Sequence, residues 1–330
     1  MVNCVDMKYG LLTYTEQGRR FNIGDYVQSL AARQFLPRVD ALINREEMAV
    51  YDGDPIKIIL NGWFTHNVVN WVPSEKIHPL FISFHVNSSA APYILSRRAL
   101  EYLKRFEPIG CRDQYTVQLL EQKGIGAYFS GCLTLTLDTY TVSQTEISDE
   151  CIIVDLLYNY PRVSSLLEDW KALARGFISG DVLDIGKRSR FIKKMLTPAL
   201  LAKARFETQL LPAGRYTDEQ KFAAADGLLK FYARARLVIT SRIHCALPCL
   251  AIGTPVIFIN GFDSIIDICR FQGIINLFNT VDVDRRGNYK ANFELPGRID
   301  LNTKVRNPTG GKVVAEHLRE KCKAFIAQTD

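Results

Sequence analysis

The fold is decided by the stretch Leu237-Val-Ile-Thr-Ser-Arg-Ile-His244, which is followed by an apolar run to Gly253. The first four residues are typical of a buried strand, and the polar turn after them opens a helix. In open α/β sheets, ligands bind at the carboxyl ends of strands. Arg242 offers a fork of donors that matches phosphate or carboxylate oxygens, and His244 can move a proton near neutral pH. The stretch therefore predicts a site where an anion is held for proton chemistry.

The rest of the chain alternates strand-like apolar runs with helical periodicity, which indicates an α/β fold with mostly parallel sheets. A polar, acidic stretch, Thr141–Glu150, separates two such halves. We expect domains over residues 1–142 and 143–330, the second closed by a C-terminal helix, with a cleft between them as a natural place for a ligand. Strands are predicted at residues 11–14, 56–60, 81–85, 109–111, 127–129, 151–155, 182–185, 209–211, 237–240 and 256–259.

Composition narrows the classes of function. The 330 residues carry a net charge of +6, which suits an anionic small molecule or an anionic membrane surface but is too weak and dispersed for nucleic acid. The N-terminus lacks the apolar core of a signal peptide, and no window approaches the ~20 apolar residues of a membrane span. We expect a cytoplasmic protein. The 8 cysteines show no metal-binding spacing, so we expect buried reduced thiols and no metal site.

A second candidate site follows the strand predicted at residues 109–111. Arg112 would lie at the carboxyl end of that strand, where it either contacts a ligand or pairs with a nearby acid. Asp113 is well placed to cap the next helix, which accounts for it without any function. Both residues are candidates for the site.

A third candidate is the run Asn22-Ile-Gly-Asp25, which precedes a predicted helix. Gly24 allows a close approach of the backbone, and free N–H groups there suit an anion or a sugar hydroxyl. The alternative is a tight turn in which Asp25 caps the helix. The G-x-G-x-x-G fingerprint, the P-loop and the G-x-S-x-G elbow are absent, which argues against a dinucleotide enzyme and a serine hydrolase of that type.

Three weaker candidates remain. Asn61 and His85 end two predicted strands and are candidate ligand contacts, with Trp63 able to stack on a sugar. The alternative makes Trp63 a core residue and His85 a satisfied buried imidazole. Ser241 is either a contact or a helix cap. The basic residues between Lys187 and Arg205 suit anionic lipid or a diphosphate, or form a solvated helix face.

Together these motifs resemble the polysaccharide pyruvyl transferase family. The resemblance spans most of the chain, and its most specific part is Thr240–His244 with Gly253-Thr-Pro255 after it. Two departures are Asn61-Gly-Trp63, where many members have a glycine-rich triplet, and Pro248 inside the expected helix. The supporting motifs are Asn22–Asp25, Arg112-Asp113 with a helix ending at Gly124, and Gly131–Thr134.

The resemblance implies two facing Rossmann-like domains, similar to GT-B glycosyltransferases. It implies phosphoenolpyruvate as donor, no other cofactor, and a saccharide diol as acceptor, lipid-linked if the usual pathway holds, with at most peripheral contact with the inner face of a membrane. The product would be a cyclic pyruvate ketal in a capsule or exopolysaccharide. Arg112 and His244 would be donor-site residues and Arg242 a neighbour. The rival interpretations are a nucleotide-sugar glycosyltransferase of the same shape and a non-catalytic glycan- or anion-binding protein.

Overall fold

Two six-stranded sheets dominate the computed structural model, which describes residues 7–16, 18–63, 71–160, 186–262 and 269–328. The first sheet has the strand order β3-β1-β4-β5-β6-β7, and all of its neighbouring strands are parallel. Its strands are β1 (Lys8–Thr13), β3 (Ala41–Asn44), β4 (Ile56–Trp63), β5 (Ile77–His85), β6 (Ile109–Cys111) and β7 (Ala127–Phe129).

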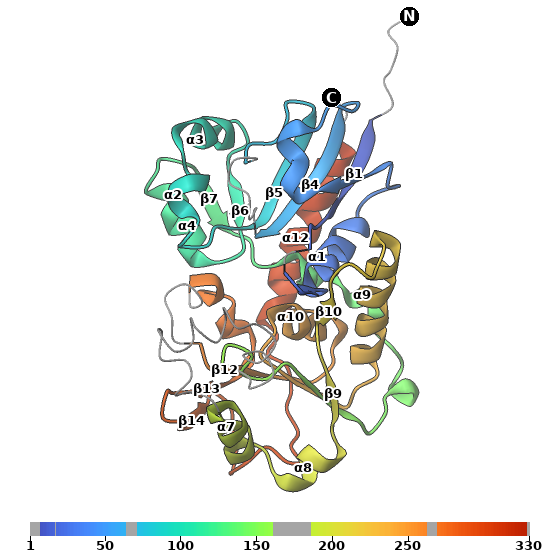
Figure 1. The fold of residues 1–330 in the computed structure, drawn as a ribbon, viewed down its shortest axis with the longest axis vertical. Helices are drawn as coiled ribbons and strands as arrows, with labels where there is room; N and C mark the ends of the chain where they lie inside the picture. The colour runs from blue at the N-terminus through green and yellow to red at the C-terminus, as the bar shows by residue number, and fades with distance from the viewer. Residues whose placement is uncertain (1–6, 17, 64–70, 161–185, 263–268, 329–330) are drawn as a thin grey trace, which may run out of the picture.

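The second sheet has the order β14-β13-β12-β11-β8-β9 and is parallel except at the β13–β14 pair. The two sheets lie one above the other in Figure 1. The predicted α/β class with mostly parallel sheets is confirmed. The strands are β8 (Cys151–Val154), β9 (Arg205–Glu207), β11 (Leu237–Thr240), β12 (Val256–Asn260), β13 (Asn279–Val283) and β14 (Tyr289–Ala291).

One predicted strand belongs to neither of the six-stranded sheets. The strand predicted at residues 209–211 is β10 (Leu210–Pro212), which pairs antiparallel with β2 (Arg20–Asn22) from the first half. This two-stranded sheet ties the two halves together beside the start of α1. The strand predicted at residues 182–185 lies outside the described residues, whereas β2, β3, β9, β13 and β14 were not predicted.

Some of the described helices begin or end at capping signals in the sequence. Asp113 caps α4 by accepting a hydrogen bond from the Thr116 amide, and Thr217 forms a capping box with Gln220 at α9. Gly253, with a φ of 91°, ends α10. The helices are α1 (Gly24–Arg33), α2 (Ala91–Ile94), α3 (Arg97–Lys104), α4 (Gln114–Glu121), α7 (Lys187–Met195), α8 (Pro198–Lys203), α9 (Asp218–Ala233), α10 (Ile243–Ile252) and α12 (Gly310–Ala327).

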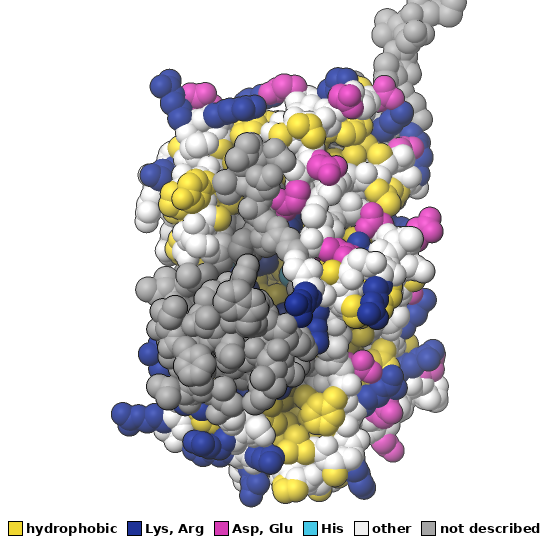
Figure 2. Space-filling view, viewed as in Figure 1, with side chains coloured by type: hydrophobic (Ala, Val, Ile, Leu, Met, Phe, Trp, Pro, Cys, Tyr) yellow, Lys and Arg dark blue, Asp and Glu magenta, His cyan; other side chains and the backbone are white. Residues whose placement is uncertain are grey.

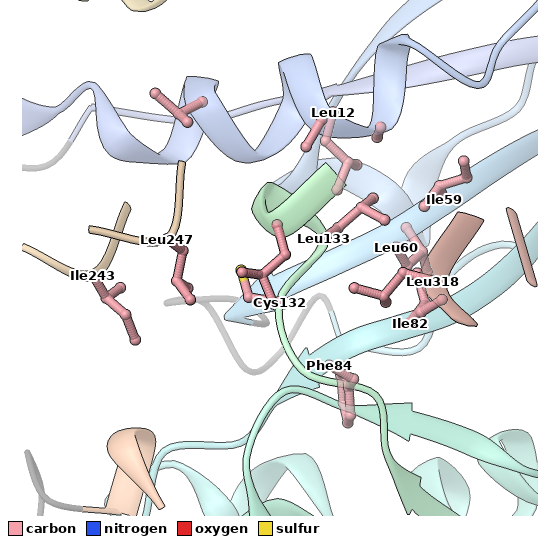
Figure 3. Close-up of a cluster of buried hydrophobic side chains, with 14 of the residues drawn as sticks. Leu12, Ile59, Leu60, Ile82, Phe84, Cys132, Leu133, Ile243, Leu247 and Leu318 are labelled. Carbon is pink, nitrogen blue, oxygen red and sulfur yellow. The ribbon is translucent and has the colours of Figure 1, made fainter. Parts of the chain in front are cut away.

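A continuous hydrophobic core joins the two halves. The short helix η3 (Leu133–Thr136) contacts α1, α10 and α12, and its Leu133 is fully buried among them. Figure 3 shows Cys132 and Leu133 lying between Leu247 of α10 and Leu60 of β4. Helix α12 ends the chain but contacts β5 of the first sheet, and it runs beside that sheet in Figure 1. None of the described helices is both long and apolar enough to cross a membrane.

We predict that Leu133→Ala lowers the free energy of unfolding by about 2–5 kcal/mol, because it leaves a cavity at the junction of three helices. The matched control is Val313→Ala on α12, where the side chain is 77% exposed and where surface substitutions change stability by about 0.5 kcal/mol or less. Urea denaturation measures both. An unfolding midpoint of Leu133→Ala equal to that of the control would contradict the role given to η3.

Candidate functional site

A cavity of about 260 Å³ lies between the two halves of the molecule. Figure 2 shows Lys and Arg side chains at mid-height of one face, where the halves meet. Arg112 reaches the cavity from the first sheet, and Arg242 and His244 reach it from the second. Residues that are 130 positions apart in sequence therefore line one small space. The described lining residues are Asn22, Asp25, Gln28, Arg45, Arg112, Tyr158, Gln209, Arg242, Ile243, His244 and Arg270.

The turn between β11 and α10 is held rigidly by its own polar residues. Thr240 donates from its hydroxyl to the Val154 carbonyl and accepts from the Arg242 amide at 2.9 Å. Ser241 donates to the Ile259 carbonyl at 2.7 Å and accepts from the Leu157 amide. Ser241 thus lies behind the cavity wall and joins three strand ends, while α10 itself has no side-chain cap. This network fixes where Arg242 and His244 point.

Arg242 already has an acidic partner. Its Nε donates to Asp155 Oδ2 at 2.9 Å, and its guanidinium carbon lies 3.8 Å from the centroid of the Tyr158 ring. Within the described residues its terminal amino groups form no hydrogen bond. The guanidinium is therefore oriented from one side by a carboxylate and a ring, which leaves donors for a ligand.

Arg112 is a buried cation with a poor partner. It is 4% exposed, and its nearest acidic oxygen is Asp113 Oδ2 at 3.7 Å. That same oxygen lies 2.6 Å from Nδ1 of His85, and the other carboxylate oxygen accepts from Thr116. No described residue accepts a hydrogen bond from the Arg112 guanidinium. Burial therefore lowers the pKa of Arg112, and a charge of this kind is stabilised by an anion in the cavity.

His244 lines the cavity with a neutral imidazole. It is 7% exposed, and its Nε2 has no partner among the described residues. Burial first, then the charges of Arg112, Arg270 and Arg242, hold the pKa of His244 well below its usual range. In the unliganded site the imidazole is therefore neutral and resists protonation.

Pro248 explains how His244 is held. Because proline has no N–H, the His244 carbonyl one turn earlier lacks its usual helical donor. Gln209 supplies one instead, since its Nε2 donates to that carbonyl at 3.1 Å. The Gln209 amide donates to Asp155, and its carbonyl accepts from Ile23. The fully buried Gln209 therefore replaces the donor that Pro248 lacks, and it connects the start of α1, the turn after β8 and α10.

The start of α1 forms a further wall. Asn22 accepts from the Gly24 amide at 3.1 Å, and Gln28 donates to Asp25 at 3.2 Å. Ile23, not Asp25, occupies the cap position. A Cβ on Gly24 would lie 3.1 Å from the Cβ of His244, so the glycine permits close packing of α1 on α10. The side-chain oxygens of this wall are neutral or negatively charged hydrogen-bond acceptors, whereas the arginines are positively charged donors.

Five predicted site residues lie outside the cavity lining: Gly24, Ser241, His85, Asp113 and Asn61. His85 and Asp113 pair in full burial behind Arg112, which is the satisfied imidazole that the alternative interpretation gave. Burial, then the charge of Arg112, lowers the pKa of His85 to about 4. Asn61 donates to the Gln28 carbonyl at 2.9 Å and so supports α1. The Trp63 side chain lies outside the described residues.

Six described lining residues were not predicted: Gln28, Arg45, Tyr158, Gln209, Ile243 and Arg270. Arg45 follows β3 directly, so the strand-end rule finds it once that strand is known. Tyr158 follows β8 by four positions. Gln209 and Arg270 carry no local signal. The basic residues at 187–205 lie on α7, α8 and β9, away from the cavity.

Comparison with known proteins gives one informative match. The family model "Polysaccharide pyruvyl transferase" matches residues 22–264, a span that includes the described cavity residues apart from Arg270. No curated protein matches the chain. Among solved structures, an uncharacterized protein from Klebsiella pneumoniae is 12% identical with a TM-score of 0.44, covering 85% of this chain and 94% of its own.

We predict that the protein loses stability as the pH falls below about 6.5, the usual pKa of an unfolded histidine. His244 and His85 have lower pKa values in the folded state, so the unfolded state binds more protons. His85, with a folded pKa of about 4, should cost about 2 kcal/mol at pH 5 relative to neutral pH, and His244 should add a cost of the same sign.

The measurement is the free energy of unfolding at pH 5 and pH 7.5. In His244→Gln, the slope of the free energy of unfolding against pH should decrease by the contribution of one titrating histidine. The exposed His317, changed to Gln, serves as the matched control and should leave the slope as in the unaltered protein. An unaltered slope in His244→Gln would show that His244 titrates normally in the folded state.

Proposed function

This chain belongs to the polysaccharide pyruvyl transferase family, and on that premise we propose that it transfers the pyruvyl group of phosphoenolpyruvate to two hydroxyls of a saccharide. The product is a cyclic pyruvate ketal, and phosphate is released. The observation that carries the proposal is the meeting of Arg112, Arg242 and His244 on one cavity, with the Arg112 guanidinium buried and poorly paired.

The charge and size of the cavity support this donor. Phosphoenolpyruvate carries roughly three negative charges near neutrality, and its phosphate and carboxylate both match guanidinium geometry. Arg112 and Arg242 are assigned to those two groups. The cavity of about 260 Å³ suits a three-carbon donor better than a nucleotide-sugar, since pockets for larger ligands run to about 300–1,000 Å³.

The proposed reaction begins with proton transfer from His244 to the methylene carbon of the donor. The adjacent carbon becomes oxocarbenium-like, one sugar hydroxyl attacks it, and its bond to the phosphate oxygen breaks. The second hydroxyl then closes the ring. Of the two hydroxyl protons, one restores His244 and the other leaves with phosphate, so atoms and charge balance. We assign the acceptor to the wall of Asn22, Asp25 and Gln28, whose oxygens and amide suit sugar hydroxyls.

His244 is neutral in the free site, so it must gain a proton before it can act as an acid. Burial and, after it, the positive charges of the arginines keep the pKa of His244 low, and a bound trianion offsets the second of these causes and so raises that pKa. Binding of the donor and protonation of His244 are therefore linked. In this scheme the imidazole becomes an acid when its substrate is present.

We predict that His244→Gln lowers turnover by about 10²–10⁴-fold, the range typical of a lost general acid, while phosphoenolpyruvate still binds. Arg112→Gln should lose donor binding itself. Turnover is followed as phosphate release and as added mass on a panel of methyl glycosides and capsule-type glycans, and binding by calorimetry. His317→Gln is the control. Full turnover in His244→Gln would remove the assigned acid, and stabilisation by nucleotide-sugars instead of phosphoenolpyruvate would favour the glycosyltransferase.

We further predict that phosphoenolpyruvate binding takes up a proton at pH 7.5. Calorimetry in two buffers with different ionisation enthalpies gives the number of protons exchanged. The unaltered protein should show uptake that approaches one proton, and His244→Gln should show almost none. Equal uptake in both proteins would assign the proton to another group.

A further inference from the structure

The turn that follows β8 has an unusual backbone. Asp155 and Leu157 have φ values of 44° and 46°, in the left-handed region that non-glycine residues rarely occupy. Such conformations persist where the surroundings hold them, and they cluster at functional sites. Here the Leu157 amide donates to Ser241 at 2.9 Å, and the Asp155 carboxylate accepts from the Gln209 amide at 3.0 Å. The Leu156 and Leu157 side chains are anchored in the core on one face of the second sheet.

This backbone presents Asp155 and Tyr158 to the arginines of the cavity. Asp155 accepts from Arg242 Nε, and the Tyr158 ring lies 3.8 Å from the Arg242 guanidinium carbon. The Tyr158 hydroxyl accepts a hydrogen bond from Nη2 of Arg270. The ring of Tyr158 is in turn held edge-on against Phe262, with centroids 5.3 Å apart. Tyr158 thus contacts two of the guanidinium groups that line the site, one through its ring and the other through its hydroxyl.

We propose that Tyr158 is a positioning residue that sets the spacing and orientation of Arg242, which binds one anionic group of the donor, and of Arg270 beside it. The proposal rests on the proposed function for the identity of the donor. Long arginine side chains lose rotamer freedom when they grip a ligand, and a rigid ring that holds them beforehand removes part of that cost. The left-handed backbone of the turn after β8 places the Tyr158 ring beside these two arginines.

The contribution of the two contacts is separable because they use different parts of the side chain. Tyr158→Phe removes the hydroxyl that contacts Arg270 and keeps the ring beside Arg242. We expect its affinity for phosphoenolpyruvate to fall about 5-fold, the loss of one modest hydrogen bond. Tyr158→Leu removes both contacts, and we expect about a 30-fold loss, as for a desolvated cation–π pair.

The experiment measures binding of phosphoenolpyruvate and of inorganic phosphate by calorimetry, with thermal unfolding to count the folded fraction. The matched control is Tyr140→Phe, whose hydroxyl donates to Asp226 at 2.8 Å outside the cavity. A double-mutant cycle with Arg270→Gln separates positioning from a general structural role. If the hydroxyl acts through Arg270, Tyr158→Phe has no further effect on affinity in the Arg270→Gln background.

The outcomes are distinct. Affinities of both Tyr158 variants equal to that of Tyr140→Phe, or an undiminished effect of Tyr158→Phe in the Arg270→Gln background, would overturn the positioning role and leave the donor assignment standing. If the unaltered protein binds inorganic phosphate but not phosphoenolpyruvate, the proposed function fails, and the same cycle read with phosphate decides the role of Tyr158. If the unaltered protein binds neither anion, both proposals fall.

Discussion

The repulsion between guanidinium groups brought to one small cavity is the constraint on which the rest of the structure depends. Arg112 comes from the first half, whereas Arg242 and Arg270 come from the second. Like charges at close range in a poorly solvated space push the two halves apart. The fold opposes this push with backbone pairing of β2 and β10, with the hydrogen bond from Ile23 to the Gln209 carbonyl, and with a core that passes through η3. The cohesion of the two halves and the binding of an anion are therefore parts of one balance.

The acids near the cavity are distributed unevenly, and this decides what each arginine can do. Asp155 lies at hydrogen-bond distance from Arg242 and orients it. Asp113 is occupied by His85 and by the first turn of α4, so it stays at 3.7 Å from Arg112. Arg242 is consequently a well-oriented donor and Arg112 an under-compensated charge. The first arrangement favours directional recognition, whereas the second favours attraction of any anion of the right size.

The strand-end rule predicted much of this site from sequence, and its failures have physical causes. Arg112, Arg242 and His244 all follow strands whose apolar runs are long enough to recognise, and the structure brings them to one cavity. Arg45 was missed because β3 was not predicted. Gln209 was missed although β10 was predicted, because β10 pairs with β2 from the other half, which periodicity along one chain cannot reveal. His85 ends β5 and Asn61 lies two residues before the end of β4, but their side chains are buried behind the wall. Sequence position gives the strand end, whereas the pleat and the register decide which side of it a residue faces.

Pro248 shows how a departure from the expected pattern is informative once its hydrogen bonds are traced. A helix with an internal proline loses one backbone donor, and a buried carbonyl without a donor costs stability. In α10 the affected carbonyl belongs to His244, and the side chain of Gln209 donates a hydrogen bond to it in place of the missing backbone N–H. This hydrogen bond ties the backbone of His244, whose imidazole lines the cavity, to Gln209. The backbone of Gln209 in turn accepts from Ile23 and donates to Asp155. Under the proposed function, a histidine that must deliver its proton to one carbon atom gains from such anchoring, because proton transfer tolerates little error in distance.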